Sequence, residues 1–170
     1  DIRIPGAHNV YNVMMAAAIV QGLCQDDDIV EVAKTFGGVE HRIEFVREFE
    51  GVKYYNDSIA SSPTRTIAGL ESFDQKLILI AGGYDKHIPY DVLGVPICRH
   101  VKTLLLTGAT APKIRACVEQ ADCPEKPEII DVPDLAAAVR CANAVAQPGD
   151  IVIMSPASAS FDCFKNFMER

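Results

Sequence analysis

Four short apolar runs constrain the fold of this chain more than any other feature of its sequence. Each is nearly continuous, which is typical of strands that are buried on both faces of a sheet. The runs are "KLILIAGG" (76–83), "VKTLLLTG" (101–108), "GDIVIMS" (149–155) and, more weakly, "PEIIDV" (127–132). Helical patterns lie between them, at 111–121 and 134–146. Strands that alternate with helices form right-handed crossovers, so the pattern predicts an α/β fold: a Rossmann-like, mostly parallel sheet with helices on both faces.

The first forty residues have a different character. The segment "NVYNVMMAAAIVQGL" (9–23) is rich in the helix formers Ala and Met, and "DDDIVEVAKTF" (26–36) places acids in the first turn of a second predicted helix. The segment "GGVEHR" then ends the helical pattern. We therefore expect a helical segment over residues 1–38 and the Rossmann-like domain over residues 39–170.

Two further elements are expected at the start of this domain. Alternating segments flank Glu50-Gly51 and predict a β-hairpin. The next segment, "SSPTRTIAGLES" (61–72), predicts a helix, because Pro63 is tolerated in a first helical turn.

Composition excludes several classes of function. The net charge of −7 argues against a nucleic-acid partner, which would require a basic face. No apolar run reaches the ~18 residues of a membrane-spanning helix, and "MMAAAIV" lacks the basic flank of a signal peptide. The six cysteines form no CxxC pair, which favours reduced thiols and a cytoplasmic location. Because the chain begins without Met and ends within a helical pattern, we expect it to be a piece of a longer protein.

Ligands of parallel α/β sheets bind beyond the carboxyl ends of the strands, so the segments that follow each strand are the candidates. They are "NDSIASS" after Tyr55, "GGYDKH" after Ala81, "TGAT" after Leu106 and "SPASAS" after Met154. Lys86 offers a cation for a carboxylate or phosphate, or is an ordinary solvated lysine. Asp57 is either a ligand or a helix cap. The chain contains neither GxxxxGK[ST] nor the GxG spacing of a dinucleotide site.

The stretch "MSPASASFDCFKNF" (154–167) runs from a strand into small residues and then into a helical pattern. We expect Ser160 at the N-cap or first turn of a last helix, with its hydroxyl facing a cleft shared with Lys86. Unpaired N–H groups at such a terminus bind anions. Phe161, Phe164 and Met168 have helical spacing, which favours packing for at least two of them.

Together and in this order, five segments resemble the Mur ligase family of peptidoglycan synthesis. They are "PGAHNVYN" (5–12), "GGVEHRIE" (37–44), "YYNDSIASSP" (54–63), "LIAGGYDK" (79–86) and "MSPASASFDCFKNF" (154–167). The "NDS" and "FKNF" motifs are similar to those of the members that add D-glutamate. The resemblance implies that residues 1–38 end a central ATPase domain and that residues 39–170 form the C-terminal domain that brings in the amino acid.

The resemblance also implies a reaction for the complete enzyme, namely ATP-dependent amide formation. ATP, with Mg²⁺, would phosphorylate the carboxylate of UDP-N-acetylmuramoyl-L-alanine, and the amine of D-glutamate would then displace phosphate. Neither cofactor is expected on this chain alone, and no residue here is a metal ligand by resemblance. The chain alone is expected to be inactive.

Residue by residue, the resemblance implies two groups of contacts. The nucleotide would contact Asn9, Asn12, Arg42 and Asp57, and D-glutamate would contact Lys86, Ser160, Phe161, Phe167 and Ser61. Lys86 and Arg42 are candidates for a catalytic role. His8 and His41 also match motif positions, without an assigned role.

One departure from the family pattern concerns residues 59 and 61. Many relatives read "NDSKATN", so Ile59 replaces a lysine and Ser61 a threonine. The hydroxyl is retained and the cation is not. Two alternatives remain open at this point: a non-catalytic module that binds an acidic amino acid, and a ligase domain similar to that of folylpolyglutamate synthase.

Overall fold

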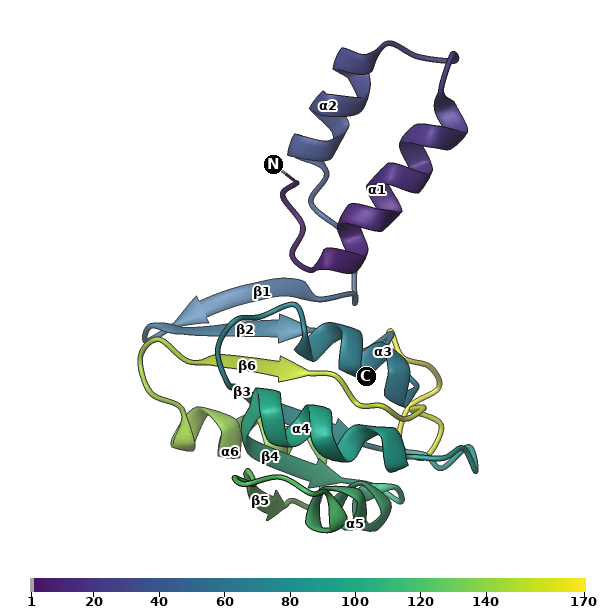
Figure 1. Cartoon of the computed structure of the whole chain (residues 1–170). Coiled ribbons are helices and arrows are strands. Elements are labelled where there is room, and N and C mark those ends of the chain that lie inside the picture. Colours follow the sequence, from purple (N-terminus) through teal and green to yellow (C-terminus); the bar gives the residue numbers. More distant parts are fainter. Residues whose placement is uncertain (1) are drawn as a thin grey trace.

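The computed structural model describes residues 2–170, and a single six-stranded sheet forms its centre (Figure 1). The strands are β1 (Glu44–Phe49), β2 (Val52–Asn56), β3 (Leu77–Gly82), β4 (Val101–Thr107), β5 (Glu128–Asp131) and β6 (Ile151–Met154). Their order in the sheet is β1-β2-β6-β3-β4-β5. Only the β1–β2 pair is antiparallel. The predicted mostly parallel sheet is therefore confirmed, with β6 inserted between β2 and β3.

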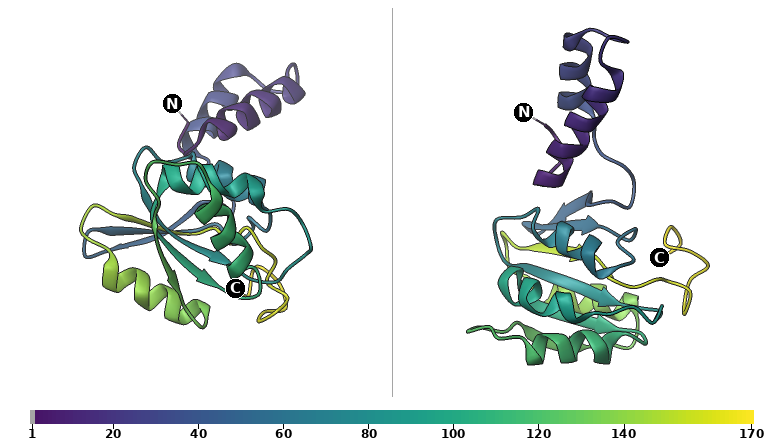
Figure 2. Two further views of the ribbon diagram at one scale, coloured as in Figure 1. Left: turned by 60° about the horizontal axis from the view of Figure 1, so that its bottom comes forward. Right: turned by 45° about the vertical axis from the view of Figure 1, so that its right-hand side comes forward.

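Helices cover both faces of the sheet, as predicted, but unequally (Figure 2). The elements are α1 (Ala7–Val20), α2 (Asp26–Thr35), α3 (Pro63–Leu70), the 3₁₀ turn η1 (Asp91–Leu93), α4 (Gly94–His100), α5 (Ala111–Gln120) and α6 (Leu135–Val145). Leu79 of β3 faces a core shared with α3, α4 and α5, whereas Ile78 and Ile80 face α6. Successive residues of a strand point to opposite faces, which explains why the buried strands are apolar throughout.

The predicted hairpin is present between β1 and β2. Glu50 and Gly51 both have positive φ, of 51° and 78°. Two positive φ values in a two-residue turn match the right-handed twist of the flanking strands.

The two N-terminal helices, α1 and α2, form an arm that stands apart from the sheet (Figure 1). Apolar side chains of α1 do not enter the core of the sheet domain; Ile19, for example, is 74% exposed, and Met14 is also exposed. An apolar groove of about 560 Å³ runs between the two helices and is lined by Val13 and Ile29, among others. The side chains of the arm therefore lie outside the core of the sheet. The expected domain boundary after residue 38 and the assignment of the arm to an ATPase domain stay predictions. Across residues 2–170, each helix is too short or too polar to cross a membrane.

The structure corrects the sequence analysis at the C-terminus. No helix follows Ser160; residues 161–170 form turns and bends, with one helical turn in which the Ser160 carbonyl accepts from the N–H groups of Cys163 and Phe164. Phe161 and Met168 are 65% and 61% exposed. The packing that their helical spacing predicted is therefore absent for both side chains. A short helix without a buried apolar face is marginal in water, which accounts for the difference.

The glycine that ends β3 provides a test of the close approach between strands. Gly82 has φ +110°, and a Cβ there would lie 1.9 Å from the carbonyl oxygen of Thr107 in β4. We expect Gly82→Ala to lower the free energy of unfolding by about 2–4 kcal/mol, because clash adds to backbone strain.

Gly149→Ala is the matched control for this variant. Gly149 has a similar φ of +96° but open space around it, so strain alone should cost about 1 kcal/mol. Urea unfolding of the chain measures both values. Equal losses for the two variants would contradict the close-approach argument.

Candidate functional site

The loops that follow the parallel strands meet at one edge of the sheet, as the strand pattern predicted. The N–H of Asp57 donates to the carbonyl of Met154 (2.9 Å), which joins the ends of β2 and β6. The N–H of Gly82 donates to the carbonyl of Pro156 (2.9 Å), which joins the ends of β3 and β6. The segments "NDSIASS", "GGYDKH" and "SPASAS" therefore form a single surface.

The serines of the last loop are mostly internal. Residues 155–160 are all buried. The Ser158 hydroxyl lies 3.0 Å from the Tyr90 hydroxyl and 2.8 Å from the Thr110 hydroxyl. Buried hydroxyls require such partners, because an unpaired polar group in the interior is destabilising. Two of the three serines, Ser155 and Ser158, thus serve to hold the loop.

Ser160 and Lys86 lie on neighbouring loops at this edge. The N–H of Tyr84 donates to the carbonyl of Ala159 (2.9 Å), so the two loops run side by side. Ser160 is only 3% exposed, whereas Lys86 is exposed and forms no salt bridge with any residue from 2 to 170. Phe161 is exposed and meets the Tyr84 ring edge-on, with centroids 6.1 Å apart. The two loops are neighbours, but the burial of Ser160 does not support a hydroxyl that is open to a cleft. The proposed contacts of both residues with D-glutamate stay predictions.

The C-terminal segment folds back over the loop after β2. The Ser58 hydroxyl donates to the carbonyl of Phe167 (2.6 Å), and the Phe167 ring meets His41 edge-on at 5.8 Å. His41 Nδ1 lies 2.9 Å from the amide nitrogen of Asn56, so both residues support this corner. Ser61, the remaining predicted D-glutamate contact, is half-buried beyond the same loop.

Arg170 is a positioning residue that the sequence analysis missed. Its guanidinium donates to the carbonyl oxygens of Ser58 (2.8 Å) and Ser158 (3.0 Å), which ties the C-terminal segment across two strand-end loops. Burial lowers its pKa to about 10. Its Nε is the only buried side-chain nitrogen or oxygen without a partner in the described residues. Nothing in the polar ending "MER" indicates this role, because both acceptors are more than ten residues away.

Asp57 is an interior residue. It is 3% exposed, its Oδ2 accepts from the Ser155 hydroxyl (2.6 Å) and its Oδ1 accepts from the N–H of Ile43 (3.2 Å). Burial raises the pKa of this carboxyl to about 6, although the two hydrogen bonds act to lower it. Both oxygens are thus already used inside the protein, and the predicted contact with a nucleotide ribose stays a prediction.

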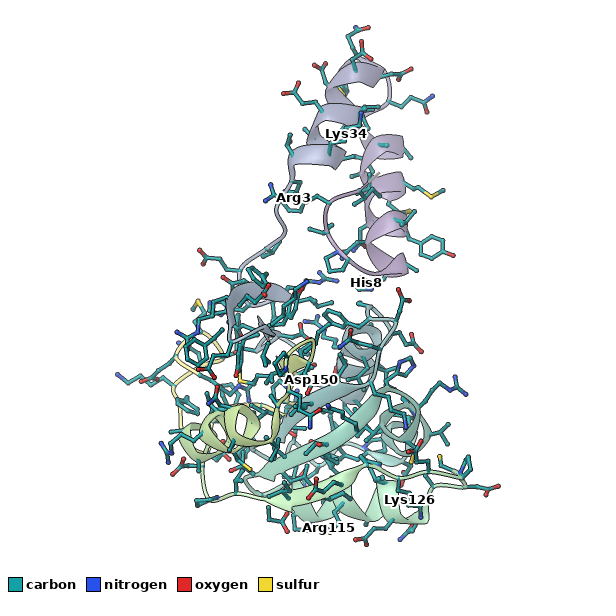
Figure 3. The ribbon with its side chains drawn as sticks, turned by 90° about the vertical axis from the view of Figure 1, so that its left-hand side faces the viewer. Arg3, His8, Lys34, Arg115, Lys126 and Asp150 are labelled. Carbon is teal, nitrogen blue, oxygen red and sulfur yellow. The ribbon has the colours of Figure 1, made fainter. Side chains whose placement is uncertain are left out.

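The remaining predicted nucleotide residues lie where the arm meets the sheet domain. The Asn9 amide donates to the carbonyl of Pro5 (2.6 Å) and accepts from the Asn12 amide (3.2 Å), so these two residues form a pair at the start of α1. Arg42 is exposed and lines a small cavity together with His8. Burial, and secondarily the Arg42 charge, lower the pKa of His8. Figure 3 shows His8 at the base of the arm, above the sheet domain.

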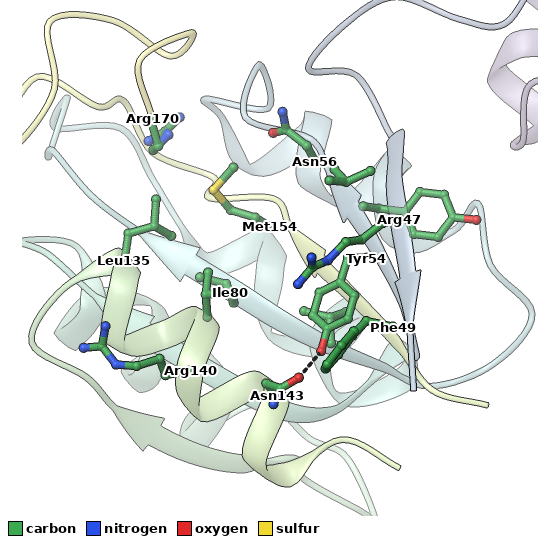
Figure 4. Close-up of a pocket in the computed structure, with 14 residues that line it drawn as sticks. Arg47, Phe49, Tyr54, Asn56, Ile80, Leu135, Arg140, Asn143, Met154 and Arg170 are labelled. Atoms are coloured by element: carbon green, nitrogen blue, oxygen red, sulfur yellow. Dashed lines mark hydrogen bonds between the residues drawn. The ribbon is translucent and has the colours of Figure 1, made fainter. Parts of the chain in front are cut away.

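A larger groove opens on the face of the sheet that carries α6 (Figure 4). It has a volume of about 650 Å³, and Tyr54 crosses it to donate to the Asn143 amide oxygen (2.9 Å). None of the predicted site residues lines it. Within residues 2–170 no group of three His, Cys, Asp or Glu side chains is arranged to hold a metal ion.

Asp57→Asn tests the energetic cost of the buried carboxylate. Because the folded-state pKa of about 6 exceeds the ordinary 3.8, the folded chain keeps a proton that the unfolded chain releases between these pH values. Stability therefore falls as pH rises from about 4 to about 6, by up to about 3 kcal/mol from this group. We expect the variant to lack this dependence of stability on pH, as measured by urea unfolding between pH 4 and pH 7.

Asp74→Asn, at an exposed position, is the control for this measurement. It should leave the dependence of stability on pH close to that of the parent chain. Equal slopes for the Asp57 variant and the parent would show that the buried carboxyl does not titrate in this range.

Residues 41–158 match the family model described as Mur ligase, glutamate ligase domain. The chain is 58% identical to the UDP-N-acetylmuramoylalanine–D-glutamate ligase of Acetivibrio thermocellus and 50% identical to that of Ruminiclostridium cellulolyticum. These matches cover 100% and 99% of the chain, and the chain spans 37% of each relative.

Solved structures confirm the fold at lower identity. The UDP-N-acetylmuramate-alanine ligase of Thermotoga maritima matches with a TM-score of 0.70 and 16% identity, over 92% of this chain and 36% of that protein. The folylpolyglutamate synthase of Mycobacterium tuberculosis matches with a TM-score of 0.63 and 18% identity, over 92% of this chain and 39% of that protein. Likeness at this level shows the α/β fold alone. The family match and the identity over the whole chain establish that this chain belongs to the Mur ligase family.

Proposed function

We propose that this chain forms the C-terminal part of a cytoplasmic, ATP-dependent ligase that adds D-glutamate to UDP-N-acetylmuramoyl-L-alanine in peptidoglycan synthesis. The observation that carries the proposal is the 58% identity, over the entire chain, to a relative named for this activity. The gathering of the motif-bearing loops at one edge of the sheet supports it. The folylpolyglutamate synthase alternative is supported only by likeness of fold, at 18% identity.

In this proposal the sheet edge holds D-glutamate. Lys86, which is exposed and unpaired among the described side chains, offers a cation for one carboxylate. We propose that the turn that begins at Ser160 and the exposed Phe161 ring contact the rest of D-glutamate. If the carboxylates are bound at fixed positions, the amine stays free and oriented for attack. This orientation lowers the entropic cost of the reaction.

The junction between arm and sheet would receive the nucleotide. Arg42 and Asn9 line one cavity at this junction, and Asn9 pairs with Asn12 on α1. ATP supplies the phosphoryl group that activates the substrate carboxylate; the amine then forms the amide bond as phosphate leaves. Because no suitable acidic cluster occurs in residues 2–170, we propose that the Mg²⁺ ligands belong to the rest of the complete enzyme.

Amide formation by the complete ligase tests this proposal directly. The complete ligase should release phosphate only when ATP, UDP-N-acetylmuramoyl-L-alanine and D-glutamate are all present. The isolated 170-residue chain should be inactive, because it contains no phosphate loop. ATP-dependent amide formation by the isolated chain, or a preference of the complete ligase for a folate substrate, would contradict the proposal. A complete protein that binds D-glutamate without turnover would favour the non-catalytic module.

Lys86→Ala in the complete ligase tests the D-glutamate site. Removal of the cation leaves a carboxylate partly desolvated, at a cost of about 2–4 kcal/mol, so KM for D-glutamate should rise on the order of 30- to 1000-fold. KM for ATP should change far less. Lys76→Ala is the control, because Lys76 pairs with Glu125 away from the strand-end loops. Equal increases for ATP and D-glutamate would place Lys86 outside this site.

A further inference from the structure

The loop "TGAT" (107–110), which the proposed function leaves without a role, packs against the loop that carries Lys86. The N–H and the hydroxyl of Thr110 both donate to the carbonyl of Gly83, at 3.1 and 3.2 Å. A Cβ at Gly108 would lie 2.7 Å from the Cα of Gly83, so no side chain separates the two backbones. The start of α5, which follows this loop, is therefore fixed beside the segment "GGYDKH".

Asp85 forms a turn around Lys86. Its Oδ1 accepts from the N–H of His87 (2.8 Å), two residues further along the chain. Such side-chain acceptors fix the local backbone, and His87 has a positive φ of 57° in this turn. Lys86 is the central residue of the turn, so the point at which its side chain leaves the backbone depends on Asp85.

Lys113, in the first turn of α5, occupies the other carboxylate oxygen of Asp85. Its Nζ lies 2.5 Å from Oδ2, whereas His87 Nδ1 lies 3.6 Å from the same oxygen, beyond hydrogen-bond distance. The hydrogen bond from Lys113 is the largest cause that lowers the pKa of Asp85. Asp85 is therefore ionised, and both of its oxygens have partners.

Lys86 is adjacent to Asp85 in the sequence but does not pair with it. Lys86 is exposed, and it forms no salt bridge with any residue of the described chain, 2–170. Lysine side chains are long and flexible, so an ionised Asp85 without Lys113 would attract the Lys86 ammonium group. A lysine in such a pair binds a ligand carboxylate only after the pair is broken, which weakens the apparent affinity.

We propose that Lys113 is a positioning residue for D-glutamate: it occupies Asp85 and thereby keeps the Lys86 ammonium group free for a carboxylate of this substrate. The inference rests on the proposed function and adds to it a residue that does not touch the substrate. It also gives the loop "TGAT" a role, because this loop places α5 within reach of Asp85.

Variants of the complete ligase test this inference. Lys113→Gln removes the charge, and Lys113→Arg retains it. Asp85→Asn removes the carboxylate charge but keeps a side-chain oxygen that can accept from the N–H of His87; it is made alone and together with Lys113→Gln. Lys76→Gln is the matched control, because Lys76 forms a similar pair with Glu125. Initial rates are measured against D-glutamate and against ATP, and thermal unfolding of each variant shows whether the fold is retained.

We expect Lys113→Gln to raise KM for D-glutamate by about two- to fivefold, because an exposed pair with Asp85 withholds part of the Lys86 population. The kcat, the KM for ATP and the unfolding temperature should stay near the parent values. Lys113→Arg should restore KM for D-glutamate toward the parent value. Asp85→Asn should raise this KM less than Lys113→Gln does, and the double variant should resemble Asp85→Asn, since neither contains a carboxylate that captures Lys86.

A salt bridge that only holds the loop predicts a different result. Lys113→Gln and Asp85→Asn would then cause equal losses, because each breaks the same ion pair. Equal losses, or a Lys113→Gln variant that resembles the Lys76→Gln control, would overturn the inference. Both results leave the proposed function intact if the parent ligase still adds D-glutamate. Failure of the parent ligase to form the amide would instead contradict the proposed function.

Discussion

The hydrogen bond between Ser155 and Asp57 is the interaction on which the rest of the site depends. It joins the ends of β2 and β6 in the interior, and the same serine hydroxyl lies 3.1 Å from the Thr66 hydroxyl of α3. Through Ile43, the carboxylate also holds the segment that leads to the arm. A buried carboxylate is costly unless its oxygens are paired, so this arrangement fixes four segments relative to one another.

This network separates residues that hold the site from residues that face a ligand. Ser155, Ser158 and Arg170 use their polar groups within the protein. Lys86 and Phe161, on the neighbouring loops, are exposed. In the proposed function, a rigid edge with a few free side chains would place a small dicarboxylate precisely, because little conformational freedom is lost on binding. The cavity between the arm and the sheet domain is the position at which we propose that the nucleotide binds.

Much of the fold could be predicted from the sequence, because it depends on local patterns. The apolar runs indicated β3, β4 and β6, and Glu50-Gly51 indicated the hairpin turn. The helix expected after Ser160 was wrong, since spacing alone does not show whether a surface is available to bury Phe161. The helix α4 was not predicted; it contains Gly94 and Pro96, which are more typical of loops.

The sequence by itself determined the α/β class, the two N-terminal helices and, through linear motifs, membership of the Mur ligase family. These properties depend on short segments of the sequence, so the residues of each segment are enough to predict them. Only the tertiary structure decided which polar groups are interior and which are free. Asp57 meets Ser155 across 98 positions, and Arg170 meets Ser58 across 112. Contacts at such separation arise from the packing of the whole sheet, which no local pattern records.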